Sequence, residues 1–294
     1  MKPGEPSRVV FGHMHEDHAL ELSLIPRLPV RKALVIASGG DLAFALAAAE
    51  VEVLAVDSNP AQISLVRQKM TCPPELLAEL CFRGKVDRVF RLGGWFPAWL
   101  LDWPRLKPGK FRRFLTHRLE ALLPRAVFLI HGPEAAARLD RSAIRLMRDR
   151  LEKAMAAPDA AGNPLLQALL GKRFGPRPPE VWSPPGIARW RSQIHRITLR
   201  HTDLGQALKE TAAGSLGLIS VSNLPDTMSA ADWTALTALA AAALSPGGFL
   251  VVRSMLCGSL PPDPLGQLIT LTHSVPDASP LCPVILTGRK PAGQ

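Results

Sequence analysis

The sequence of 294 residues predicts an α/β fold: a Rossmann-like open sheet with a large helical insertion after its second β-α unit. Two observations predict this fold. Short apolar, β-rich runs alternate with segments of helix formers at both ends of the chain, and parallel strands need such helical crossovers. The middle of the chain carries helix formers and Gly/Pro-rich links instead. Because 47% of the residues are apolar, the chain can bury a sizeable core.

The first two β-α units precede the insertion. The run ALVIA at 33–37 predicts a buried strand that ends in the glycine turn SGGD, and residues 41–50 hold helix formers without a breaker. A second strand is expected from Val51 to Asp57. The helix expected at 59–70 opens with Asn-Pro, a favourable helix start.

Within the insertion we expect helices joined by irregular links. The helices are expected at 75–82, 111–123, 134–157 and 164–170. The proline-rich stretch GPRPPEVWSPPG at 175–186 predicts a loop or a polyproline-like connector.

The alternation of strands and helices resumes near residue 195. Strands are expected at 195–203, 217–223 and 247–255, helices at 204–210 and 229–244, and an edge hairpin from 268–274 and 283–288. Ser229 is expected to open the longer helix. We therefore expect an α/β domain of residues 1–70 and 195–294, and a helical basic insert, 71–194, that serves as a lid or binds an acceptor.

Positive charge is concentrated in the middle of the chain. Residues 71–200 hold 24 Lys and Arg against 11 Asp and Glu, while the whole chain has a net charge of +10. Such a surface suits an anionic partner. Peripheral contact with an anionic membrane is one expectation, a phosphorylated substrate is another, and nucleic acid is less favoured. A solvated basic surface without a partner is the alternative.

Cysteine spacing and hydropathy predict the compartment. The four cysteines form no C-x-x-C pair, the first residues do not resemble a signal peptide, and no apolar run reaches the roughly 18 residues that span a bilayer. We expect a cytoplasmic protein that reaches the inner membrane face peripherally at most. The segment with Trp95, Trp99 and Trp103 mixes aromatic and basic residues, which is typical of a membrane-interface segment and also of a lid with inward tryptophans.

Small and acidic residues follow the expected strands, at the edge where open parallel sheets bind ligands. They occur as SGGD at 38–41, DSN at 57–59, TD at 202–203 and SNLPD at 222–226. Asp57 can accept hydrogen bonds from ribose hydroxyls, and Asp203 can accept one from an adenine amino group.

The glycine turn has neither G-x-G-x-x-G spacing nor a P-loop lysine, so a pyrophosphate is not favoured. An adenosyl ligand without phosphates, S-adenosyl-L-methionine (SAM), fits better. A structural α/β domain without a nucleotide is the alternative.

Three blocks resemble a known family. LVIASGGDLAFALA, VLAVDSNPAQISLVRQKM and ISVSNLPDTM resemble the SAM:diacylglycerol 3-amino-3-carboxypropyltransferases of betaine-lipid synthesis and their uncharacterised bacterial relatives. The resemblance covers roughly 8–70 and 195–255. It implies a SAM-dependent methyltransferase-type fold and transfer of the aminocarboxypropyl group of SAM to a hydroxyl of a lipid or small-molecule acceptor, with release of methylthioadenosine. Where the family has a C-W-E-D-like string, this chain has M-H-E-D, so His15 stands at the family's Trp.

The candidate SAM-binding residues lie in and around these strand ends. They are Ser38, Gly39, Gly40, Asp57, Ser58, Asn59, Gln62, Asp203, Leu204, Ser222, Asn223 and Asp226. The resemblance places Asn223 and Asp226 near the reacting end of SAM.

The candidate catalytic residues are His15, Glu16 and Asp17, because a hydroxyl nucleophile needs a base. Alternatively, Glu16 and Asp17 hold the amino group of the methionyl moiety. Arg200 or Arg253 would then hold its carboxylate.

The string FGHMHEDH at 11–18 has the H-x-H-x-D-H spacing of metallo-β-lactamase-type hydrolases. Only about a dozen residues precede His13, too few for the strands such a fold needs upstream, and no later histidine lies in the Gly-His turn that it requires. We therefore expect no metal and interpret the string as part of an acceptor site or as surface histidines.

Two further functions are alternatives. A SAM-dependent methyltransferase acting on a small molecule or RNA would release S-adenosylhomocysteine. A non-catalytic SAM-fold protein would bind a membrane or RNA through the basic insert. The sequence does not predict the oligomeric state.

Overall fold

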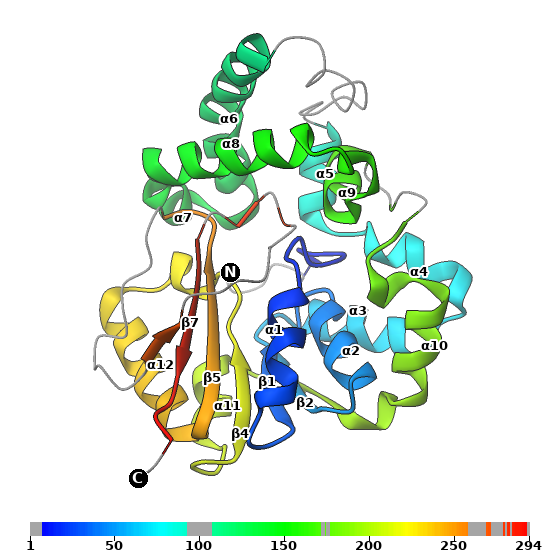
Figure 1. Ribbon diagram of the computed structural model, residues 1–294, viewed down its shortest axis with the longest axis vertical. Coiled ribbons are helices and arrows are strands. Elements are labelled where there is room, and N and C mark those ends of the chain that lie inside the picture. Colours follow the sequence, from blue (N-terminus) through cyan, green and yellow to red (C-terminus); the bar gives the residue numbers. More distant parts are fainter. Residues whose placement is uncertain are drawn as a thin grey trace.

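The computed structural model describes residues 8–92, 108–171, 174, 177–257, 269–271, 279, 281–282 and 284–292. A seven-stranded sheet lies between helices on both of its faces (Figure 1). The strands are β1 (Lys32–Ile36), β2 (Glu52–Asp57), β3 (Ile197–His201), β4 (Leu216–Ser220), β5 (Leu244–Ser254), β6 (Ile269–Leu271) and β7 (Val284–Arg289).

The strand order is β3-β2-β1-β4-β5-β7-β6. Neighbours from β3 to β5 run parallel, whereas β7 runs antiparallel to both β5 and β6. This is the Rossmann-like, methyltransferase-type sheet that the sequence predicts, and the expected edge hairpin of β6 and β7 is confirmed. The order reverses between β1 and β4, and ligands of open α/β sheets bind at such a switch point.

The helices account for most of the remaining described residues. They are α1 (Ala19–Leu24), α2 (Asp41–Ala48), α3 (Pro60–Thr71), α4 (Pro74–Cys81), α5 (Lys85–Leu92), α6 (Pro108–His131), α7 (Pro133–Arg138), α8 (Arg141–Ala156), α9 (Pro164–Gly171), α10 (Pro184–Ser192), α11 (Leu204–Lys209) and α12 (Ala230–Ala243).

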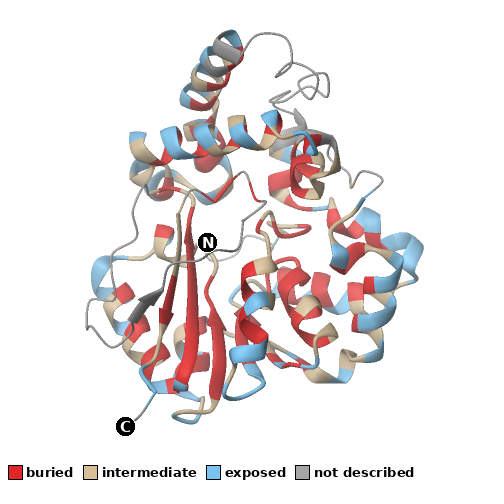
Figure 2. Ribbon diagram, in the orientation of Figure 1, coloured by how far each residue is buried: buried red, intermediate tan, exposed pale blue. Residues whose placement is uncertain are grey.

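Each face of the sheet has its own core, because alternate residues of a strand point to opposite faces. Ala33 and Val35 of β1 belong to a buried cluster with α1, α2, α3, α4 and α10. Leu34, between them, belongs to a second cluster with α11 and α12. Burial on both faces explains why the strands read as continuous apolar runs (Figure 2).

The helical insertion lies between α3 and β3, as predicted, but its parts pack differently. Helices α6 to α9 share a separate core with Leu256 and Leu281, and they lie together at one end of the sheet (top in Figure 1). By contrast, Leu77 of α4 and Trp190 of α10 are buried in the core around β1.

Three sequence predictions within the insertion need correction. The single helix expected at 134–157 is two helices, because the Asp140 carboxylate accepts a hydrogen bond from Ala143 N at 2.6 Å and caps α8. The helix expected at 111–123 continues through Pro124 to His131. The connector expected at 175–186 is not all loop, because α10 begins at Pro184. Proline is tolerated in the first turn of a helix, where its missing N–H would have no partner.

Two expectations concern membranes. Among the helices of the described residues, none has both the length and the apolarity needed to cross a bilayer. The aromatic-basic segment with Trp95, Trp99 and Trp103 lies outside the described residues.

Candidate active site

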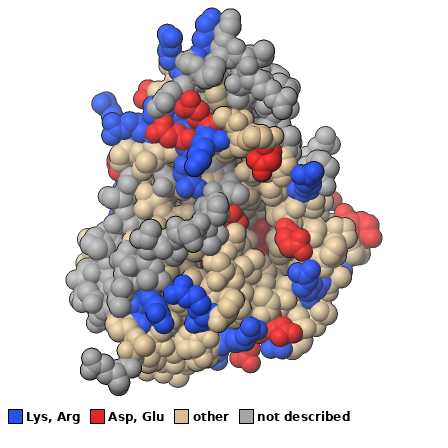
Figure 3. Space-filling model, viewed as in Figure 1, with Lys and Arg blue, Asp and Glu red and all other residues tan. Residues whose placement is uncertain are grey.

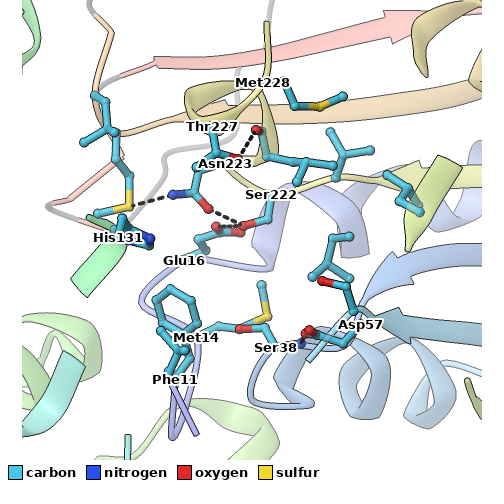
Figure 4. Close-up of a pocket in the computed structure, with 18 of the residues that line it drawn as sticks. Phe11, Met14, Glu16, Ser38, Asp57, His131, Ser222, Asn223, Thr227 and Met228 are labelled. Atoms are coloured by element: carbon cyan, nitrogen blue, oxygen red, sulfur yellow. Dashed lines mark hydrogen bonds between the residues drawn. The ribbon is translucent and has the colours of Figure 1, made fainter. Parts of the chain in front are cut away.

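A cavity of about 870 Å³ opens at the switch point between β1 and β4. Its polar end is lined by residues that follow the strands, among them Ser38, Asp57 and Ser222 (Figure 4). The sequence rule that ligands bind outside the carboxyl ends of parallel strands therefore leads to the cavity.

Ser38 and Ser222 follow β1 and β4, and both have left-handed backbones, with φ of 44° and 52°. Residues other than glycine rarely adopt this conformation, and such strain clusters at ligand sites. The Ser38 N–H donates to Asp57 Oδ2 at 3.2 Å, and the Asn59 N–H donates to Asp57 Oδ1 at 2.9 Å. Burial raises the pKa of Asp57, although these two hydrogen bonds act to lower it. The Asp57 carboxylate is thus fixed at the cavity edge.

The adenine-side candidates also border the cavity. Ser58, Asp203 and Leu204 line it where β2 and β3 end. Asp203 Oδ1 accepts from Gln206 N at 2.8 Å and caps α11, which fixes the carboxylate next to the cavity.

Gly39 and Gly40 have a different use from the one predicted. A Cβ on Gly39 would lie 2.6 Å from His13 Cα, and Gly40 has a φ of 92° at the start of α2. Neither glycine is one of the described residues that line the cavity. The turn needs glycine because the chain segment around His13 lies directly on it.

Three predicted ligand residues instead hold backbone in place. Gln62 Oε1 accepts from Val10 N at 2.6 Å, and its Nε2 donates to Ser38 O at 2.7 Å, so it joins the N-terminal segment to the glycine turn. Asn59 caps α3. Asp226, 1% exposed, accepts from Met255 N at 2.7 Å and from Leu256 N at 3.2 Å. Asn223, in contrast, lines the cavity.

Two of the three catalytic candidates lie at the cavity and the third does not. His15 and Glu16 line the cavity. Asp17 does not line it in the described part of the chain. Its Oδ1 accepts from Ala19 N at 2.9 Å, at the start of α1.

Glu16 is the buried carboxylate of the cavity. Its Oε1 accepts a hydrogen bond from Ser222 Oγ, and its Oε2 lies 3.6 Å from Arg253 Nη1. Burial raises the pKa of Glu16, although the Arg253 charge and the Ser222 hydrogen bond act in the opposite direction. Oε2 is buried and has no hydrogen-bond partner among the described residues, so the Arg253 guanidinium is the charge beside it.

The two arginines considered for a ligand carboxylate are already engaged. Arg253 is fully buried and makes two hydrogen bonds with Glu21, at 2.5 and 2.9 Å. Arg200 pairs with Glu210 on the surface. In the described part of the chain, neither arginine lines the cavity.

The histidine string does not form one ligand set. His18 stands directly before α1, without a capping hydrogen bond from its side chain, and lines a second cavity of about 370 Å³. His13 is 1% exposed, and burial lowers its pKa to about 4, so its imidazole is neutral at pH 7. Burial also lowers the pKa of His15.

The other end of the cavity is apolar and comes from the insertion. Leu123, Val127 and Ile130 of α6 line it with Met147 of α8. His131, the last residue of α6, lies on the same side near Asn223 (Figure 4). Partial burial lowers the pKa of His131. Sequence reasoning did not select His131, because nothing in its neighbourhood in the chain marks it.

Comparisons with known proteins add little. No family model matches this chain, and no curated protein matches it. Two structures of the rRNA methyltransferase aviRa from Streptomyces viridochromogenes, at 2.4 Å and 1.5 Å, are each 14% identical to it, cover 99% of this chain and 88% of their own, and give a TM-score of 0.36. A likeness at this level carries no argument about function, which depends on the residues of the site rather than on the fold.

Proposed function

We propose that this protein is a SAM-dependent transferase that moves the 3-amino-3-carboxypropyl group of SAM to a hydroxyl of an apolar, lipid-like acceptor. The observation that carries the proposal is the two-sided chemistry of the 870 Å³ cavity. Polar side chains at the strand ends occupy one end, and apolar side chains of α6 and α8 occupy the other. A polar nucleoside donor and an apolar acceptor would meet between them.

On the donor side, each polar residue has a proposed partner in SAM. Asp57 accepts from the ribose hydroxyls, and Asp203 accepts from the adenine amino group. The carboxylate of Glu16, which lines the cavity, accepts from the amino group of the methionyl moiety. The surroundings of Arg253 and Arg200 support neither arginine as the partner of the methionyl carboxylate.

On the acceptor side, we assign the general base to His131. The acceptor oxygen attacks the carbon that joins the aminocarboxypropyl group to sulfur, and the bond from that carbon to sulfur breaks. Its electron pair stays on sulfur, which gives methylthioadenosine, and the hydroxyl proton passes to His131. A lowered pKa keeps His131 neutral and able to accept a proton at pH 7.

The insertion also supplies a proposed membrane contact. Phe128 and Leu129 of α6 are 53% and 54% exposed, and Arg125 on the same helix is exposed. Figure 3 shows Lys and Arg side chains on the insertion, with Asp and Glu side chains beside them. Apolar and basic groups together suit an anionic bilayer surface. Co-sedimentation with vesicles should rise with anionic lipid content, and binding that is independent of it would remove the electrostatic basis.

The test is product identification. The protein is incubated with SAM and a total lipid extract, and the nucleoside product is identified by mass spectrometry. We expect lipid-dependent methylthioadenosine. Asp57→Ala should abolish it, whereas Glu52→Ala, at the exposed opposite end of β2, should not.

S-adenosylhomocysteine would instead identify a methyltransferase, which the sheet order also allows. Failure to bind SAM at all would support a non-catalytic role. His131→Gln tests the base, since it should lower kcat while SAM affinity stays unchanged.

A further inference from the structure

Two imidazoles and one carboxylate meet between the segment before α1 and the start of α5. One ligand atom from each of His13, His15 and Asp87 lies within 4.8 Å of the other two. Asp87 Oδ1 is 3.7 Å from His13 Nδ1 and 3.9 Å from His15 Nε2. The side chains are 1%, 11% and 4% exposed. Two imidazoles with one carboxylate are a common donor set for Zn²⁺ and Fe²⁺.

His13 would bind a metal through Nε2, because the Nδ1 that lies 3.7 Å from Asp87 Oδ1 also contacts a backbone carbonyl. Its Nδ1 lies 2.8 Å from Cys81 O, and because a carbonyl only accepts hydrogen bonds, Nδ1 carries the proton and Nε2 the lone pair. Nε2 is buried and has no hydrogen-bond partner among the described residues. A backbone carbonyl on the opposite ring nitrogen fixes the tautomer that presents a lone pair to a metal. A bound cation would satisfy this otherwise orphaned acceptor.

Asp87 is oriented too. Its Oδ2 accepts from Gly84 N at 3.1 Å, which leaves Oδ1 facing both imidazoles. The nearby ammonium of Lys69 donates to Gly12 O at 2.5 Å and to Gly39 O at 2.7 Å. Two hydrogen bonds of the Lys69 ammonium are therefore made to backbone carbonyls.

The surroundings close the cluster on one side and open it on the other. The rings of Phe82 and Phe174 lie 4.8 Å and 5.3 Å from the His13 ring, centroid to centroid, and exclude water there. His15 lines the large cavity. Coordination positions that the protein does not fill would face that cavity.

We propose that His13, His15 and Asp87 bind one divalent transition-metal ion, for which Zn²⁺ is the probe. The ion would fix the segment 9–18 against α5. No metal was expected from the sequence, because the chain lacks the upstream strands and the later Gly-His turn of the hydrolases that share the spacing of the string. The carboxylate of the cluster is Asp87, far along the chain. The proposal is independent of the transfer reaction.

The test measures metal binding, not activity. The full chain is stripped with a chelator, and Zn²⁺ is titrated against a chromophoric competitor, with metal content measured after dialysis. We expect one Zn²⁺ per chain and a higher thermal midpoint with Zn²⁺. Asp87→Asn and His13→Gln should each weaken binding by at least about 100-fold, beyond the loss typical of a second-shell change. His18→Ala, in the same string but outside the cluster, is the matched control and should bind normally.

Two results would overturn the site: no stoichiometric binding by the wild type, or binding that persists in both ligand variants, which means adventitious Zn²⁺ only. If a variant fails to fold by circular dichroism, Co²⁺ bound to the wild type decides. Visible d–d absorption that His13→Gln or Asp87→Asn, whichever folds, shifts or removes supports these ligands. A spectrum of hydrated Co²⁺ in the wild type contradicts them.

Discussion

The buried pair of Glu21 in α1 and Arg253 in β5 should dominate the acid sensitivity of the fold. Both side chains are 0% exposed, and the guanidinium donates to both carboxylate oxygens. Ser220 Oγ donates to the same carboxylate at 2.9 Å. Burial by itself would raise the pKa of Glu21, but the charge and hydrogen bonds of Arg253 outweigh it and lower this pKa from 4.5 to about 2.

The size of the effect follows from this difference in pKa. A shift from 4.5 to about 2 corresponds to about 3 kcal/mol, since one pKa unit is worth about 1.4 kcal/mol. Because the folded-state pKa is the lower one, the unfolded state binds more protons between these values. The contribution is complete above pH 4.5 and falls as the pH falls toward 2, with about 2 kcal/mol of it gone by pH 3.

Urea unfolding at pH 7, 5, 4 and 3 tests this. Glu21→Gln should lose about 3–5 kcal/mol of unfolding free energy at pH 7, because buried Arg253 loses its hydrogen-bonded carboxylate and keeps only Glu16, 3.6 Å away, as a charged neighbour among the described residues. The difference between wild type and variant should shrink as the pH falls. The matched control is Glu210→Gln, which breaks the exposed pair with Arg200 and should change little at any pH. A difference for Glu21→Gln that stays constant from pH 7 to 3 would refute the assigned pKa.

Three further predictions concern the cavity and its surroundings. Gln62→Ala removes side-chain hydrogen bonds to the N-terminal segment and to Ser38 O, and it should cost about 2–3 kcal/mol of unfolding free energy in urea. The variant should also bind SAM more weakly in calorimetry. Unchanged SAM affinity would show that this link does not shape the site. Gly40→Ala should lower the free energy of unfolding in urea more than Gly214→Ala does. Both positions have a positive φ, which costs about 1–3 kcal/mol for alanine, but a Cβ at residue 40 would also lie 2.7 Å from the Phe44 ring, whereas a Cβ at residue 214 would have no atom within 4 Å. Equal losses would contradict this steric reason. Val127→Phe fills the apolar end of the cavity and should reduce lipid-dependent product without altering SAM affinity. Leu129→Phe, at an exposed position of the same helix, should leave both product formation and SAM affinity unchanged. Equal activity of the two variants would place the acceptor elsewhere.

The sheet and its strand ends were predictable because burial on both faces leaves continuous apolar runs. Those runs located β1, β2 and β4 to within a few residues, and with them Ser38, Asp57 and Ser222 at the cavity. Local sequence is enough here, since each of these residues lies at or directly after the end of its strand. Helix boundaries in the insertion were less predictable, because one capping side chain, such as Asp140, decides where a helix breaks.

Contacts between distant parts of the chain were not predictable. The sequence block around Gln62 suggests a ligand-binding residue, yet its side chain accepts hydrogen bonds from backbone N–H groups 51 and 52 residues earlier. The H-x-H-x-D-H spacing suggests Asp17 as the acid that accompanies the histidines, yet the acid beside His13 is Asp87. His131 reaches the cavity only because α6 continues through Pro124 for two further turns. In each case the partner is set by tertiary packing and not by spacing.

The N-terminal segment is the part of the site that the strand-end rule does not cover. Residues 9–16 lie across the glycine turn and are held there by Gln62, by Lys69 and by Asp41, which accepts from Met14 N at 3.1 Å. These three side chains belong to α2 and α3, the helices that follow β1 and β2. The sheet therefore fixes a segment that in turn places His15 and Glu16 at the cavity. Because this segment is outside the strands, substitutions in it can change what meets the donor while the sheet stays intact.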